Sequence, residues 1–198
     1  MRPSERTTAI LVDGSNLHAT YEALGLTSVD FKRVLQHFEG TILHAGYFTA
    51  LPPNTEQSTL RPMVDWLDFN GWTVYQKEWK EFFDPVTRER KIKGNMDVEI
   101  AVIAKELAPY ITHIVLFSGD GDFKFLVEAM QRAHRVHVTV VSSIKTRPAM
   151  CADSLRRQAD TFIDLVDLHP HIGRVTKTAV DAVMSPAGSK RYRFNSGS

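Results

Sequence analysis

Short apolar runs rich in β-branched residues alternate along the chain with segments whose apolar residues recur at helical spacing. The runs predict buried strands, and the helical spacing predicts amphipathic helices. Asp30 stands where a helix N-cap is expected, and Gly25, Gly40 and Gly71 stand where helices should end. The predicted strands are 7–14, 41–50, 72–79, 112–118 and 135–143, and the segment 160–168 is expected to begin as a last strand. The predicted helices are 15–25, 30–40, 56–69, 97–107, 123–134 and 148–159.

The regular alternation predicts an α/β fold in which a mostly parallel sheet carries helices on both faces. Residues 82–93 interrupt this order, because the turn-forming pair Asp84-Pro85 and the alternating charges after it predict a hairpin. The apolar pattern fades after His169, where Pro, Gly, Ser and cationic residues follow. We therefore expect one domain over residues 1–171 and a basic, flexible tail over residues 172–198.

Composition narrows the class of protein without pointing to a partner. The formal net charge is +1, so a surface that binds nucleic acid would have to be a local patch. Cys151 is the only cysteine, which excludes an internal disulfide and a cysteine-based zinc site. No apolar run is long enough for a signal peptide or a membrane span. We expect a cytoplasmic protein without a membrane partner.

Four aspartates fall where one edge of the predicted sheet is expected. Asp13 follows the first strand, and Asp120 and Asp122 follow the strand that ends near Ser118. Asp97 begins the helix that leads back to that same strand. Functional sites in open parallel sheets lie outside the carboxyl ends of the strands. The sequence therefore predicts that these four acids share one site.

Clustered carboxylates without neighbouring cations repel one another, and a divalent ion removes that penalty. Mg²⁺ and Mn²⁺ prefer oxygen ligands and commonly bind a few carboxylates together with a substrate phosphate. Asn16 and Ser118 could orient the acids or hydrogen-bond the waters of the ion. Taken singly, Asp13, Asp97 and the "GDGD" turn are better explained as turn and helix-start residues. The expected position of all four aspartates at one edge of the sheet favours a metal site suited to phosphodiester hydrolysis.

Three motifs, in this order, resemble the NYN domain, a PIN-like family of metal-dependent ribonucleases. They are "ILVDGSNL" (10–17), "KGNMDVEIAV" (93–102) and "IVLFSGDGDFKFLVEAM" (114–130). The chain is most similar to the LabA-like bacterial branch, and "ADSLRRQADTFIDL" (152–165) resembles the end of that domain. The resemblance covers residues 7–168. It implies a PIN-like three-layer α/β/α sandwich with an acidic site that uses Mg²⁺ or Mn²⁺.

The resemblance also implies roles for individual residues. Asp13 matches the first-strand acid of the family, and Asn16 matches the asparagine that follows it. Asp97 matches the acid of the Lys-Gly-x-Asp motif, but here two residues, Asn95 and Met96, stand between the glycine and the acid. The acidic turn of the family corresponds to Asp120 and Asp122, with the serine before it at Ser118. The resemblance thus implies a catalytic, metal-binding set of Asp13, Asp97, Asp120 and Asp122.

A phosphate backbone would need local cations near this site. The segment "RERKIK" (88–93) leads into Asp97, and "SSIKTRP" (142–148) follows a strand that ends at the same edge. Aromatic residues on the hairpin, Trp79, Phe82 and Phe83, could stack on unpaired bases. A solvated hairpin with aromatic residues packed beneath it explains them equally well. The candidate RNA-binding residues are Arg88, Arg90, Lys91, Lys93, Lys145 and Arg147.

The leading hypothesis is a metal-dependent ribonuclease that prefers single-stranded RNA. The alternative is a non-catalytic RNA-binding or regulatory module that retains the acidic pocket. RNA binding without metal dependence or turnover would favour this alternative. The sequence also leaves a homo-oligomer open.

Overall fold

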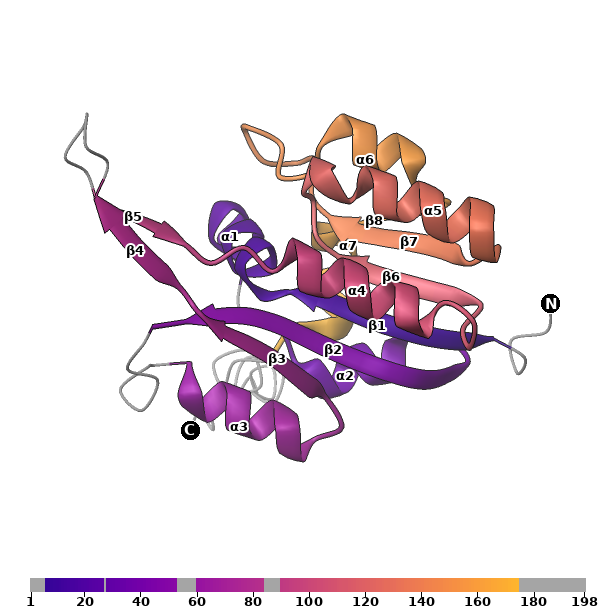
Figure 1. Cartoon of the computed structure of the whole chain (residues 1–198), viewed down its shortest axis with the longest axis horizontal. Helices are drawn as coiled ribbons and strands as arrows, with labels where there is room; N and C mark the ends of the chain where they lie inside the picture. The colour runs from indigo at the N-terminus through magenta and orange to yellow at the C-terminus, as the bar shows by residue number, and fades with distance from the viewer. Residues whose placement is uncertain (1–5, 27, 53–59, 84–89, 175–198) are drawn as a thin grey trace, which may run out of the picture.

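The computed structural model describes residues 6–26, 28–52, 60–83 and 90–174. At its centre lie the parallel strands β1 (Thr7–Asp13), β2 (Thr41–Leu51), β3 (Thr73–Glu78), β6 (His113–Phe117), β7 (His137–Ser142) and β8 (Thr161–Asp164). They form one six-stranded sheet in the order β3-β2-β1-β6-β7-β8 (Figure 1). This arrangement confirms the predicted α/β fold.

Helices cover both faces of this sheet and complete a three-layer sandwich. Within the described residues they are α1 (Gly14–Leu24), α2 (Phe31–His37), α3 (Arg61–Phe69), α4 (Asp97–Leu107), α5 (Lys124–His134), α6 (Asp153–Gln158) and α7 (Leu165–Ile172). One face carries α4, α5 and α6, and the other carries α1, α2, α3 and α7 (Figure 1). These helices therefore cover both faces, as a buried parallel sheet requires.

The core consists of two apolar clusters separated by the sheet. Successive strand residues point to opposite faces, so neighbours in β1 enter different clusters. Ala9 and Leu11 pack beneath α4, α5 and α6, whereas Ile10 and Val12 pack beneath the other four helices. All four of these side chains are at most 1% exposed. This burial on both faces explains why the strand reads as a continuous apolar run rather than an alternating one.

The strand order places a topological switch point between β1 and β6. From β1 the chain proceeds outward through β2 and β3, and it then returns through α4 to β6 on the other side of β1. The connections that leave β1 and β6 therefore diverge at the carboxyl edge of the sheet. A crevice at such a point is the usual ligand site of open α/β sheets.

The domain ends in a helix that the sequence did not predict. The segment 160–168 begins as a strand, as expected, but β8 ends at Asp164 and α7 follows directly. The strand gives way to a helix at this point because the Asp164 side chain accepts a hydrogen bond from the Val166 backbone N–H and so caps α7. The chain then pairs Gly173 with Val29, and the predicted tail lies outside the described residues from residue 175 onward.

Helix α6 is shorter than the predicted helix over residues 148–159. The backbone N–H groups of Met150 and Cys151 donate to the Ser143 carbonyl, and that of Ala152 donates to the Gly119 carbonyl. These bonds tie residues 150–152 to the ends of β7 and β6, so the helix begins only at Asp153.

The predicted hairpin is present as the antiparallel strands β4 (Lys80–Phe83) and β5 (Arg90–Lys93). It extends beyond the carboxyl edge of the main sheet, on the side where β1 meets α1 (Figure 1). Its predicted turn and the predicted start of the helix over 56–69 lie outside the described residues. In the described part of the chain, no helix has the length and apolar character needed to cross a lipid bilayer.

His113 gives the fold a stability that depends on pH. Its ring is 4% exposed and lies between the hydroxyl groups of Thr8 and Thr139, at 3.2 and 2.8 Å. Burial, and then the positive charge of Arg6, lower the pKa of His113 to about 4. The unfolded chain, with an ordinary histidine pKa near ~6.5, therefore binds more protons than the folded chain between these two values.

We expect the free energy of unfolding to fall as the pH decreases from 7.5 to 5, with about 2 kcal/mol of that loss due to His113. Urea titrations of the wild type and of His113→Gln at both pH values measure the part of this loss that is due to His113. The variant should be less stable at pH 7.5 but lose less stability on acidification. Equal losses in both proteins would contradict this role for His113.

Candidate metal centre and cleft

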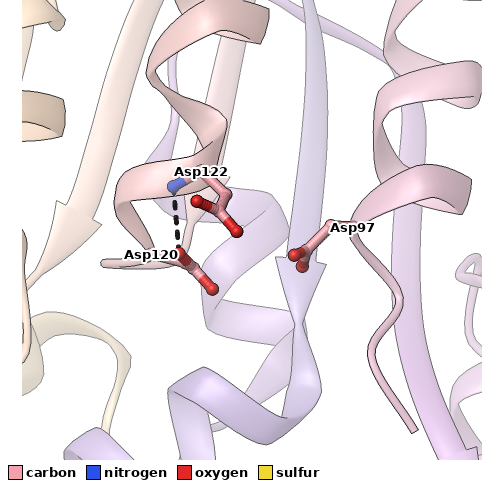
Figure 2. A group of neighbouring side chains, drawn as sticks. All are labelled: Asp97, Asp120 and Asp122. Carbon is pink, nitrogen blue, oxygen red and sulfur yellow. Dashed lines mark hydrogen bonds between the residues drawn. The ribbon is translucent and has the colours of Figure 1, made fainter.

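Three carboxylates converge at the switch point. Asp97 begins α4, whereas Asp120 and Asp122 belong to the turn between β6 and α5. One oxygen from each of the three carboxylates lies within 4.8 Å of the other two. Figure 2 shows the three side chains facing a common space from the two connections. The structure thus brings Asp97 together with two acids that lie more than twenty residues later in the sequence.

Asp13 occupies a different position beside this cluster. It lines the same cleft as Asp97 and Asp120, but it is not one of the three clustered acids. Its side chain is 6% exposed and accepts hydrogen bonds from the Ser15 hydroxyl at 2.8 Å and the Asn16 backbone N–H at 3.1 Å. The Ser118 hydroxyl lies 3.2 Å from its second oxygen. Asp13 therefore caps α1 and ties the end of β1 to the end of β6.

Asn16 and Ser118 hold the acidic turn in place. The Asn16 side-chain oxygen accepts a hydrogen bond from the Gly119 backbone N–H at 2.9 Å, and the Ser118 hydroxyl accepts one from the Asp120 N–H at 3.2 Å. Within the turn, Asp120 accepts a hydrogen bond from the Asp122 N–H at 3.0 Å (Figure 2). Of the two roles considered for Asn16 and Ser118, these contacts support orientation of the acids.

Asn95 is a site residue that the sequence reasoning missed. Its side-chain N–H donates to the Asp97 carboxylate at 2.6 Å, and its side-chain oxygen accepts from the Asp97 backbone N–H at 2.9 Å. Met96, the next residue, is 4% exposed and packs in the core beneath α4. The two residues between Gly94 and Asp97 therefore anchor the helix start and aim its first carboxylate. The available signal was an asparagine two residues before a helix-start acid, a common local turn.

Electrostatics at the cluster favour a bound cation. Burial raises the pKa of Asp97, its hydrogen bond from Asn95 opposes that rise, and the charges of Asp120, Asp13 and Asp122 raise it further. Like charges in such a group destabilise one another unless a cation neutralises them. The ligand atoms are all carboxylate oxygens, which suit a hard divalent ion. The cluster of Asp97, Asp120 and Asp122 could therefore bind a metal ion.

The cluster opens into a cleft of about 900 Å³. Asp13, Asp97 and Asp120 line the cleft, as does Trp79 at the base of the hairpin. The cleft therefore combines carboxylates with an aromatic wall, and it is large enough for more than one nucleotide-sized group.

The start of α4 is joined to the sheet by Lys77 of β3. The Lys77 ammonium group lies 2.8 and 3.0 Å from the two carboxylate oxygens of Glu99.

The predicted cationic residues are distributed unevenly around this cleft. Lys145 is exposed and donates to the Asp167 carboxylate at 2.6 Å, so a phosphate would have to compete with that partner. Arg147 is exposed in the loop after β7. The backbone of β5 carries Arg90, Lys91 and Lys93 toward Asp97, but their side chains, like Arg88 as a whole, lie outside the described part of the protein.

The four aspartates lie in one continuous stretch that is similar to known proteins. The family model of the NYN domain matches residues 7–168. The chain belongs to the NYN domain family. The low amplitude and bright protein LabA of Synechococcus elongatus is 35% identical over 181 residues, which cover 89% of this chain and 91% of that protein. A crystal structure of a protein of unknown function from Vibrio parahaemolyticus has a TM-score of 0.66 and 27% identity, and the match covers 83% of this chain and 96% of that one.

The family assignment confirms the resemblance that the sequence motifs indicated. NYN domains act on nucleic acids, and the family suggests a nuclease. The acidic cluster of this NYN chain lies at the switch point of its sheet, where such an activity would be expected.

Proposed function

We propose that this NYN protein is a metal-dependent ribonuclease that hydrolyses phosphodiester bonds of RNA. The observation that carries the proposal is the convergence of Asp97, Asp120 and Asp122, with mutual oxygen distances within 4.8 Å, at the switch point of a NYN domain. Separate turns that merely end strands would not require three carboxylates to face one space.

Each acid has a distinct part in the proposed site. Asp97, Asp120 and Asp122 would hold Mg²⁺ or Mn²⁺, since the cluster offers oxygen ligands alone. Asp13 would add negative charge beside the ion and keep the acidic turn against β1 through Ser118. A divalent ion bound there supplies a Lewis acid and activates water at neutral pH. Asn95 would hold Asp97 in the required direction.

The substrate is proposed to be single-stranded RNA. Trp79 on the cleft wall could stack on an unpaired base, and Arg147 is exposed at the same edge of the sheet. The basic residues Arg88, Arg90, Lys91 and Lys93 are proposed to contact the phosphate backbone. Lys145 would contact an RNA phosphate after breaking its ion pair with Asp167. A cytoplasmic location and a homo-oligomer stay predictions.

Metal removal tests this function directly. Labelled single-stranded RNA should be cleaved in Mn²⁺ or Mg²⁺ and should stay intact after EDTA treatment, because the three acids then hold no ion. Adding Mn²⁺ back should restore cleavage, which a denaturing gel would show. Cleavage that persists in EDTA would contradict the proposal. RNA binding without turnover in either metal would instead favour the non-catalytic module.

A further inference from the structure

A second hollow, which we call the apolar groove, borders the acidic cleft and has no role in the proposed chemistry. Its volume is about 260 Å³, and it lies between α1 and the start of α2. Gly14, His18, Tyr47 and Met63 line both the groove and the cleft. The two hollows therefore adjoin each other along these four residues.

The walls of the groove are aromatic and aliphatic. Tyr21, Phe31 and Tyr47 contribute rings, and Leu17 and Val29 contribute buried aliphatic side chains. Besides the tyrosine hydroxyls, the polar side chains of the lining are His18, Glu22 and Ser28, and His18 and Glu22 lie 3.5 Å apart. Such a lining suits a flat, uncharged group and disfavours a phosphate, which would lose its hydration without contacting a lysine or arginine.

We propose that the apolar groove holds the nucleobase of the nucleotide next to the phosphate that is cut, an inference that rests on the proposed ribonuclease function. Pockets for whole drug-sized ligands span roughly 300–1,000 Å³, so this smaller groove suits one ring system rather than an independent ligand. A nucleotide joins a flat base to an anionic phosphate over a short distance. The groove and the acidic cleft offer these two environments side by side.

The border between the two hollows fits the sugar that joins base and phosphate. A Cβ atom on Gly14 would lie 2.6 Å from the Tyr47 hydroxyl oxygen, so only glycine lets the start of α1 approach this ring so closely. Tyr47 and Gly14 line both hollows, so the Tyr47 hydroxyl lies at their border, where it could donate a hydrogen bond to a ribose hydroxyl or a phosphate oxygen.

The test replaces single bases rather than the whole RNA. Binding of a short single-stranded RNA is compared with binding of the same RNA carrying one abasic ribose at successive positions, by fluorescence anisotropy in Mn²⁺. Ser28→Trp fills the groove from an exposed lining position, and Ala23→Trp places the same side chain at an exposed position of α1 outside the groove. A gel of each sample after titration reports cleavage.

One abasic position should weaken binding to the wild type by about tenfold, because one stacked base is lost. Ser28→Trp should bind the intact RNA about tenfold more weakly and lose the difference between intact and abasic RNA. Ala23→Trp should behave as the wild type. Equal binding of all oligonucleotides by the wild type, or unchanged binding by Ser28→Trp, would overturn the inference.

The same samples separate this inference from the proposed function. Cleavage in Mn²⁺ without any effect of abasic positions would leave the ribonuclease standing and remove the base site. An abasic effect that Ser28→Trp abolishes, without cleavage, would leave the base site standing and remove the hydrolysis. Absence of RNA binding would refute both. A dimer of the wild type that Ser28→Trp dissociates would assign the groove to a second copy of the chain and overturn the base assignment.

Discussion

Replacing Asp120 with asparagine should lower metal-dependent RNA cleavage by about 10³-fold while the protein stays folded. The side-chain oxygen of asparagine can still accept the hydrogen bond from the Asp122 N–H, so the turn should persist. What is lost is one of the three negative charges that face the common space. Metal ions contribute several kcal/mol of transition-state stabilisation, and each ~1.4 kcal/mol is a tenfold change in rate.

Two measurements and one matched control check this expectation. Calorimetric titration with Mn²⁺ should show at least about tenfold weaker binding to Asp120→Asn than to the wild type, independently of turnover. Asp68→Asn makes the same chemical change at an exposed position of α3, and it should match the wild type in both assays. Equal cleavage by the wild type and Asp120→Asn would show that a contaminating nuclease cuts the RNA. Unchanged Mn²⁺ affinity would remove Asp120 from the metal centre.

Elements with a strong apolar pattern and a local cap were predictable from the sequence. Helix α4 begins at Asp97 and ends at Leu107 as predicted, and Asp30 caps α2 through the backbone N–H groups of Lys32 and Arg33. Helix α7 was not predictable in this way. The apolar run through Asp164 continues with strand-like residues, and the change to helix depends on that one side chain as a cap.

The candidate site was predictable in its location but not in its contacts. The rule that parallel strands present functional residues at their carboxyl ends places Asp13, Asp97 and Asp120 together without coordinates. It does not distinguish the three clustered acids from Asp13. The Asp13 carboxylate instead accepts hydrogen bonds from Ser15, Asn16 and Ser118. That distinction depends on side-chain directions set by packing. The same limit applies to Lys145, whose partner Asp167 lies on a helix that the sequence did not predict.

Gly119 illustrates how closely the acidic turn is packed, and its replacement by alanine should have the second largest effect. A Cβ atom at this position would overlap the carbonyl oxygen of Met150 and the hydroxyl oxygen of Ser142. The backbone cannot move away, because the Gly119 N–H donates to Asn16 and its carbonyl accepts from Ala152. We expect a loss of about 3 kcal/mol in the free energy of unfolding, as for overpacked cores.

Gly121→Ala provides the matched control in the same turn. A Cβ atom on Gly121 would lie 3.1 Å from the Ala152 Cβ and 3.5 Å from the Ser154 hydroxyl oxygen, contacts that small shifts can accommodate. Thermal unfolding should show a Tm lower by about 6–12 °C for Gly119→Ala and a much smaller change for Gly121→Ala. Because the strained residue directly precedes Asp120, Gly119→Ala should also bind Mn²⁺ more weakly at a temperature where it is fully folded. Equal Tm and equal Mn²⁺ affinity for the two variants would show that the turn tolerates a side chain at Gly119, and that its backbone does not set the position of Asp120.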